Sequence, residues 1–222
     1  MRTQQATISA ALQTIDVKEE GPSMTRIITG LAMSLDGYIA GPDDSREHPL
    51  GTGGDRLFEW YFDGDTSSHL YPSFRLSQQS AEFFDELAGR CGAVITGRHT
   101  YDLVDAWNGK GPLPGAPLFV LTHRVPDIVP DGEPPYTFVT GGIGDAVDQA
   151  RVAAGDKDVS VMGSAGVQQA LQEGLLDEII VHLVPVLLGG GVRLLEGIEA
   201  DLRCTRVVDA PGVTHLSYDV VR

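Results

Sequence analysis

The sequence has few cysteines, few cations and no long apolar segment. Its 222 residues include only Cys91 and Cys204, which lie too far apart along the chain to match a metal-binding or redox motif. No apolar run approaches the roughly 18 residues that a membrane-spanning helix needs, and the first residues lack the pattern of a secretory signal. These absences predict a reduced, cytoplasmic protein with no membrane partner.

Cations are scarce, because 16 Lys and Arg residues stand against 31 Asp and Glu residues, with a formal net charge of −15. A surface of that sign repels nucleic acids and anionic membranes, so neither is expected as a partner. A protein of this composition that binds an anionic cofactor has to gather its few cations at the binding site. Two cationic pairs follow predicted strands: Arg98 with His99, and His123 with Arg124.

Several common motifs are also missing. The chain has no P-loop sequence, and residues 140–144 fall short of the glycine pattern of a Rossmann dinucleotide site. Ser164 is not a hydrolase nucleophile, because Met162 stands where that motif needs glycine. The six histidines are scattered without zinc-binding spacing, so no metal site is expected.

The remaining pattern is an alternation of strands and helices. Residues 1–23 are polar and are expected to form a flexible extension, followed by a single domain over residues 24–222. Strands are predicted at residues 27–33, 93–96, 118–122, 136–140, 159–162 and 178–188. Helices are predicted from Ser80 to Ala88, from about residue 98 to Asp105, from Asp145 to Ala154 and from the glycine turn at 163–166 to about residue 173.

This alternation predicts an α/β fold with three layers, in which helices cover both faces of a mostly parallel sheet. Residues 205–209 and 213–220 predict a closing antiparallel hairpin. Pro185 predicts an edge position or a bulge, because proline cannot donate to a strand ladder. The run at 179–188 is too apolar for an exposed edge, which predicts a homodimer. Residues 41–78 have no clear assignment.

Three segments at strand ends predict a binding site: residues 96–101, 122–124 and 162–167. Ligands of parallel sheets bind at the carboxyl ends of the strands, where all three segments lie. The third segment opens a helix whose free N–H groups suit a phosphate, and the other two supply Arg98 and Arg124. Either arginine alone is more simply explained as a solvated surface charge. Both at one edge, beside a glycine turn, favour an anionic dinucleotide.

The order and spacing of these pieces resemble the dihydrofolate-reductase-like superfamily over nearly the whole chain. The sequence is most similar to the C-terminal reductase domain of the bifunctional riboflavin-biosynthesis deaminase-reductase and to its stand-alone bacterial relatives. The matching segments are 34–40, 95–102, 119–124, 161–174, 175–179 and 185–194. The deaminase half and its zinc motif are missing, so a stand-alone member is expected.

The resemblance implies an NADPH-dependent reductase that transfers hydride to a C=N or C=O carbon of a small heterocyclic molecule. The implied substrates are of the pteridine or ribosylaminouracil type, as in 5-amino-6-(5-phosphoribosylamino)uracil reduction during riboflavin biosynthesis. The implied cofactor-binding residues are Gly97, Arg98, His99, Thr100, Thr122, His123, Arg124, Met162, Gly163, Ser164, Ala165, Gly166 and Val167. The implied substrate-binding residues are Ser34, Leu35, Gly37, Phe58 and Trp60. A homodimer is also common among such reductase domains.

Hydride transfer to a heterocycle also needs a proton donor, for which Asp36 is the first candidate and Glu59 the second. An Asp-Gly pair after a strand is also ordinary turn chemistry, so a structural role for Asp36 stays open. Ser164 departs from the family pattern, which usually has a second glycine there. A second hypothesis therefore stands beside the reductase: a cofactor-binding or regulatory protein of the same fold without turnover.

Overall fold

The structure is a computed structural model that describes residues 25–129 and 131–222. The expected extension at residues 1–23 lies outside the described residues. In chain order the elements are β1 (Ile27–Ser34), β2 (Tyr38–Ala40), η1 (Gly54–Tyr61), α2 (Gln78–Arg90), β3 (Cys91–Gly97), α3 (Arg98–Leu103), η2 (Asp105–Gly109), β4 (Leu118–Leu121), β5 (Thr137–Val139), α4 (Ile143–Ala154), β6 (Asp158–Met162), α5 (Ser164–Gln172), β7 (Glu178–Val184), β8 (Val192–Arg193), β9 (Asp201–Ala210) and β10 (Val213–Val221).

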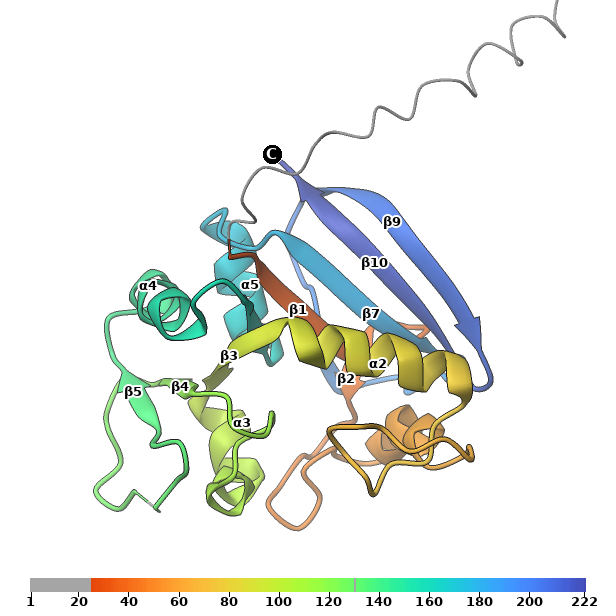
Figure 1. The fold of residues 1–222 in the computed structure, drawn as a ribbon, viewed down its shortest axis with the longest axis horizontal. Helices are drawn as coiled ribbons and strands as arrows, with labels where there is room; N and C mark the ends of the chain where they lie inside the picture. Colours follow the sequence, from red (N-terminus) through yellow and green to blue (C-terminus); the bar gives the residue numbers. More distant parts are fainter. Residues whose placement is uncertain (1–24, 130) are drawn as a thin grey trace, which may run out of the picture.

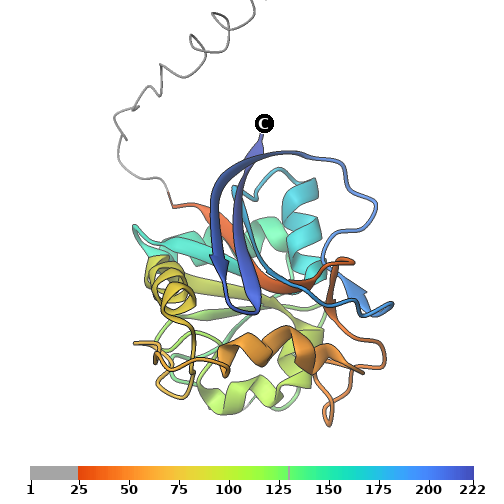
Figure 2. The same ribbon diagram turned by 90° about the vertical axis from the view of Figure 1, so that its right-hand side faces the viewer.

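Eight strands form the central sheet in the order β5-β4-β3-β6-β1-β7-β10-β9 (Figure 1). The strands from β5 to β7 pair in parallel, whereas β10 runs antiparallel to both β7 and β9. The predicted mostly parallel sheet with a C-terminal hairpin is therefore confirmed. Figure 2 shows that the ribbon of this hairpin is strongly curved.

Helices cover both faces of the parallel part because its strands are apolar on both faces. In β1, Ile27 belongs to the cluster under α4 and α5, and the next residue, Ile28, belongs to the cluster that includes Phe83 of α2. A third cluster under η1 joins Leu57 and Trp60 to β1, β7 and the hairpin. This third cluster anchors much of the segment that the sequence left unassigned.

Two helices begin earlier than predicted. Ser77 caps α2, because its side chain accepts a hydrogen bond from the backbone N–H of Ser80, the residue predicted as the cap. Helix α4 begins at Ile143, after Gly142, so Asp145 lies inside the first turn. The positive end of the helix dipole still stabilises a carboxylate in the first turn, which explains why the sequence pattern pointed to Asp145.

The prediction that Pro185 marks an edge or a bulge is wrong. Strand β7 ends at Val184 and lies between β1 and β10, so the proline simply follows the strand. The edges of the sheet are β5 and β9. Because β7 is covered within the chain, its apolar character gives no reason for self-association. The expectation of a homodimer then depends on the family resemblance alone.

A second, two-stranded sheet pairs β2 with β8 and was not predicted. The backbones approach so closely here that a Cβ on Gly191 would lie 2.1 Å from the carbonyl oxygen of Ala40. Gly191 also has φ +123°, which side-chain-bearing residues rarely adopt. Only glycine therefore fits where the chain enters β8.

An ion cluster joins α2 to the first residues of β6 and β7. Arg90 lies 2.8 Å from Asp158 and 2.7 Å from Glu178, and Arg26 lies 3.2 Å from Glu178. The two carboxylate side chains are only 10% and 6% exposed. Such buried charges are tolerated only when they are paired and hydrogen-bonded.

Replacing Arg90 with Met should lower the free energy of unfolding by roughly 3 kcal/mol, because Asp158 and Glu178 lose a partner while remaining buried. Urea unfolding followed by circular dichroism measures this change. Arg203→Met is the control, since it breaks an exposed pair with Asp219 and should cost at most about 1 kcal/mol. Equal losses in the two variants would contradict the importance of burial.

Candidate functional site

The register between β3 and β6 determines where the site forms. Thr96 pairs with Met162, so the two following glycines, Gly97 and Gly163, lie at the same edge of the sheet. Helix α3 starts after Gly97 and helix α5 after Gly163. A Cβ on Gly163 would lie 3.2 Å from Thr100 Oγ1, which shows how closely the two helix starts approach.

A cavity of about 350 Å³ opens at this edge, and we call it the edge cavity. Eight of the predicted cofactor-binding residues line it: Gly97, His99, Thr100, Met162, Gly163, Ser164, Ala165 and Gly166. Its other walls come from β1, β2, β8 and η2, through residues such as Leu31, Ile39, Val192 and Trp107. Among the described residues that line it, the titratable side chains are Asp44 and His99, paired at 2.7 Å.

The glycine turn meets the geometry that a close ligand requires. Gly163 has φ +82°, so glycine is needed there whether or not a ligand binds. Ser164 is the first residue of α5 and its backbone is not in the left-handed region. The Cβ that Ser164 carries, in place of the usual glycine, is therefore accommodated without backbone strain.

The Arg98 side chain contacts the backbone of the turn that carries Arg124. Nη1 of Arg98 donates to the carbonyl oxygen of Arg124 at 3.3 Å. Each guanidinium also pairs with a carboxylate, Arg98 with Asp102 and Arg124 with Asp127, at 2.8 Å in both cases. Because the Arg124 pair is largely exposed, it is worth little and can exchange for another anion.

The other predicted cofactor residues lie outside the edge cavity. The Thr122 hydroxyl donates to the carbonyl oxygen of Arg124 and so shapes the turn that carries this arginine. His123 is exposed and lines neither this cavity nor the second one described below. Val167 is fully buried in the core beneath α5, so its side chain supports the helix.

The predicted substrate residues after β1 form a tight turn. Gly37 adopts φ +89° and donates its N–H to the carbonyl oxygen of Ser34, while the Ser34 hydroxyl accepts from Tyr38. Leu35 is 63% exposed. None of residues 34–37 lines the edge cavity, whose walls use Leu31 and Ile39 on either side of the turn instead.

Asp36 ties this turn to the loop after β7. Its carboxylate accepts hydrogen bonds from the backbone N–H groups of Leu188, at 3.1 Å, and Gly189, at 2.7 Å. A hydrogen bond from Ser34 and these backbone bonds lower the pKa of Asp36 to about 2. An ionised carboxylate has no proton to give at neutral pH, so the observed contacts favour the structural role that the sequence left open.

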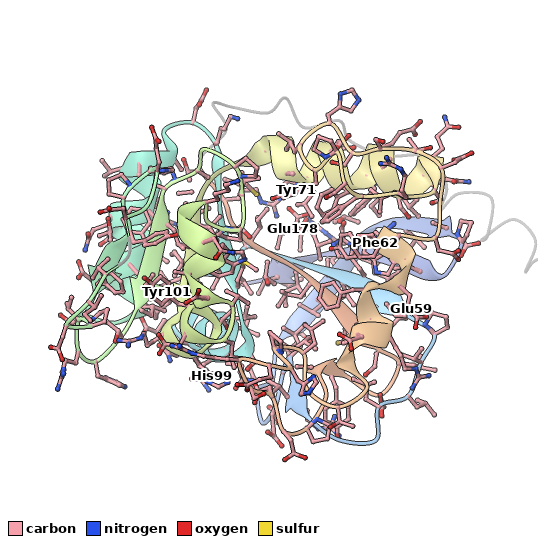
Figure 3. All side chains as sticks on the ribbon, turned by 90° about the horizontal axis from the view of Figure 1, so that it is seen from below. Glu59, Phe62, Tyr71, His99, Tyr101 and Glu178 are labelled. Carbon is pink, nitrogen blue, oxygen red and sulfur yellow. The ribbon has the colours of Figure 1, made fainter. Side chains whose placement is uncertain are left out.

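The predicted residues of η1 divide between surface, core and cavity. Glu59 is exposed on the side of η1 that faces away from α3 (Figure 3). Trp60 is buried, donates its indole N–H to the carbonyl oxygen of Leu57 and contacts the buried His182. Phe58, the other substrate-binding candidate on η1, lines the edge cavity.

A second cavity of about 300 Å³ adjoins the first, and we call it the aromatic cavity. Six aromatic side chains line it: Phe58, Tyr61, Tyr71, Phe74, Phe84 and Trp107. Three residues, Phe58, Trp107 and Met162, line both cavities. The sequence analysis missed most of these side chains, although the concentration of aromatic residues between Phe58 and Phe84 is a visible signal.

Trp107 is positioned by an unusual backbone. Residues 105–108 have φ between +47° and +51°, a run of four left-handed residues without glycine. Each such residue costs roughly 1–2 kcal/mol relative to a right-handed one. Non-glycine residues in this region often occur at functional sites, and here the turn places an indole in the walls of both cavities.

A family model described as the RibD C-terminal domain matches residues 25–216. The chain belongs to this family. A search of curated proteins gives no significant match. The order of strands and the helix starts described above are thus those of a RibD C-terminal domain, and the predicted relationship is confirmed.

Solved structures agree with this assignment. A putative riboflavin biosynthesis protein from Shewanella sp. PV-4 is 25% identical, with a TM-score of 0.67 over 89% of this chain and 100% of its own. A deaminase/5-amino-6-(5-phosphoribosylamino)uracil reductase from Thermotoga maritima is 13% identical, with a TM-score of 0.55; the match covers 89% of this chain and 57% of that one. Dihydrofolate reductase from Enterococcus faecalis, complexed with NADP(H), is 15% identical, with a TM-score of 0.52; the match covers 90% of this chain and 98% of that one. The fold is therefore dihydrofolate-reductase-like.

Among the described residues, no helix combines the length and the apolar character that a membrane-spanning segment needs. Within the same part of the chain, no group of three or more His, Cys, Asp or Glu side chains could hold a metal ion.

Asp36→Asn should destabilise the protein in a pH-dependent way. The pKa of Asp36 is about 2 in the folded state against an ordinary value of 3.8, so its stabilising effect is complete above pH 4 and disappears as the pH falls towards 2. Melting temperatures of both proteins between pH 6 and pH 2 measure this effect. Asp148→Asn, at an exposed position, should show no such trend. A destabilisation by Asp36→Asn that is constant with pH would contradict this account.

Proposed function

We propose that this protein is an NADPH-dependent reductase of a small heterocyclic molecule. The observation that carries the proposal is the edge cavity, into which the starts of α3 and α5 both open. Family membership supports an oxidoreductase role, and the name of one fold relative records NADP(H) as its bound ligand. When bound, NADPH supplies a hydride from its nicotinamide ring.

The residues of the edge cavity fit a dinucleotide with a pyrophosphate. The first turn of α5 leaves the N–H groups of Ser164, Ala165 and Gly166 without an intrahelical acceptor. Neither α3 nor α5 has an acidic residue in its first turn. Asp44 pairs with His99 at the start of α3, whereas no carboxylate contacts the start of α5 among the described residues, so the positive end of the α5 dipole faces the cavity. In a chain of net charge −15, this local field is what attracts an anion.

The remaining walls of the edge cavity are mostly apolar and aromatic. Leu31, Ile39 and Val192 form an apolar surface that excludes water from a bound cofactor. Trp107 and Phe58 separate this space from the aromatic cavity while bordering both. Neither Asp36 nor Glu59 lines either cavity, so we assign the proton that the reduction consumes to neither of them.

The preference for NADPH over NADH should depend on Arg98 and Arg124. A guanidinium is a strong partner for a phosphate, and these two lie together beside the start of α3. Arg98→Glu or Arg124→Glu should weaken NADPH binding about tenfold and NADH binding much less, as measured by titrating nicotinamide fluorescence. Arg151→Glu, on α4, is the control for the change in net charge. Equal losses for the two cofactors would place the 2′-phosphate elsewhere.

Gly163→Val should abolish NADPH binding and leave the fold intact. The substitution forces a β-branched residue to φ +82°, which costs roughly 1–3 kcal/mol, and adds bulk where the cavity wall meets Thr100. Ser164→Gly is the matched control and should keep the affinity. Fluorescence titration measures binding and circular dichroism measures folding. Normal binding by Gly163→Val would show that this turn is only a connection.

The competing hypothesis of a binding protein without turnover rested on Ser164, which α5 accommodates without strain. Single-turnover experiments separate the two. A reductase should transfer deuterium from 4-deuterated NADPH to one product of a heterocycle screen. Tight NADPH binding with no transfer to any pteridine or aminouracil compound would support the binding protein instead.

A further inference from the structure

The aromatic cavity differs from the edge cavity in its lining and lies next to it. It rests against the proposed reductase site, because Phe58, Trp107 and Met162 line both cavities. A molecule in the aromatic cavity therefore lies within reach of a cofactor in the edge cavity. The inference below depends on the proposed function for this reason, and it concerns the class of molecule that is reduced.

The rings of the aromatic cavity form one connected wall. The ring centroid of Tyr61 lies 4.8 Å from that of Phe74 and 5.6 Å from that of Phe84. Phe58 stacks on Tyr61 with 5.5 Å between the ring centroids. Tyr71 stacks on Phe74 at 5.0 Å. Trp107, which belongs to η2, completes the lining. Ring surfaces of this kind favour a flat, unsaturated ligand that stacks against them.

No charged side chain lines the aromatic cavity among the residues that the structure describes. Two of its five polar side chains are already engaged, since the Tyr71 hydroxyl donates to the carbonyl oxygen of Pro112 and the Cys91 thiol to that of Leu87. Tyr61, Trp107 and Ser160 remain to hydrogen-bond a ligand. Hydroxyl and indole groups can satisfy a ring nitrogen or a carbonyl, but they cannot neutralise an anion.

Two arginines that lie close in sequence to lining residues are committed elsewhere. Arg75, on the loop that carries Phe74, donates to Ser67 and to the carbonyl oxygen of Pro72. Arg90, which follows Ala88 on α2, is held by Asp158 and Glu178. An anion placed in the aromatic cavity would lose its water of hydration without gaining a cationic partner from the lining, which disfavours its binding.

We propose that the acceptor enters the aromatic cavity as a flat, uncharged ring system that carries no phosphate. This departs from what the family resemblance implied, because a phosphoribosylamino substrate brings a phosphate dianion with it. The lining accepts the heterocyclic part of such a molecule and gives its phosphate no cation. The substrate class of this chain is thus narrower and more apolar than the family name suggests.

The test measures the Kd of three probes for the full chain by ligand-observed NMR, with and without saturating NADPH. The probes are quinoxaline, an uncharged fused ring; quinoxaline-6-carboxylate, the same ring with a charge; and ribose 5-phosphate. Quinoxaline should bind with a Kd at least about tenfold lower than that of its carboxylate, and ribose 5-phosphate should not displace it. Phe74→Ala and Phe84→Ala should each raise the Kd of quinoxaline about tenfold.

Phe62→Ala is the matched control, because Phe62 touches Phe74 but is 61% exposed and lines neither cavity. It should change the Kd of quinoxaline less than twofold. The proposal is overturned if the carboxylate or ribose 5-phosphate binds as well as quinoxaline, if quinoxaline does not bind, or if both Ala variants bind it normally. Loss of NADPH binding with quinoxaline binding intact would instead overturn only the proposed function.

Discussion

The pairing of β3 with β6 is the constraint on which the site depends. Parallel strands in register end at the same level, so Gly97 and Gly163 deliver two helix starts to one point on the sheet edge. A slip of one residue between these strands would end them at different levels and separate these starts. Side chains from both faces of β3 and β6 pack into the core, so the packing that holds the two strands together also positions the helix starts.

Local sequence signals predicted the part of the site that is itself local. Gly97 and Gly163 each follow a short apolar strand, and a turn after such a strand can be recognised without knowing the rest of the fold. The contact of the Arg98 side chain with the backbone of Arg124 agrees with the same rule, because strand ends in a parallel sheet share an edge. The family pattern added the cofactor, which no single motif indicates.

The aromatic cavity could not be predicted in the same way. Its walls come from η1, the following loop, α2 and η2, and only tertiary packing decides which aromatic side chains enter the core and which line a space. Phe58 and Trp60 show the difference, although they are only two residues apart. Trp60 is buried against His182, whereas Phe58 lines both cavities. Asp36 illustrates a related limit, because a motif gives the residue type but not the partners that determine its pKa.

The small sheet of β2 and β8 has a consequence for how the protein matures. Val192 completes the wall of the edge cavity that Leu31 and Ile39 begin, so residues about 160 positions apart must meet before the cavity is closed. During synthesis, the helix starts at Gly97 and Gly163 are made well before this wall exists. The edge cavity is therefore complete only after β8 has been made, and a ligand that needs all of its walls can stabilise only the completed domain.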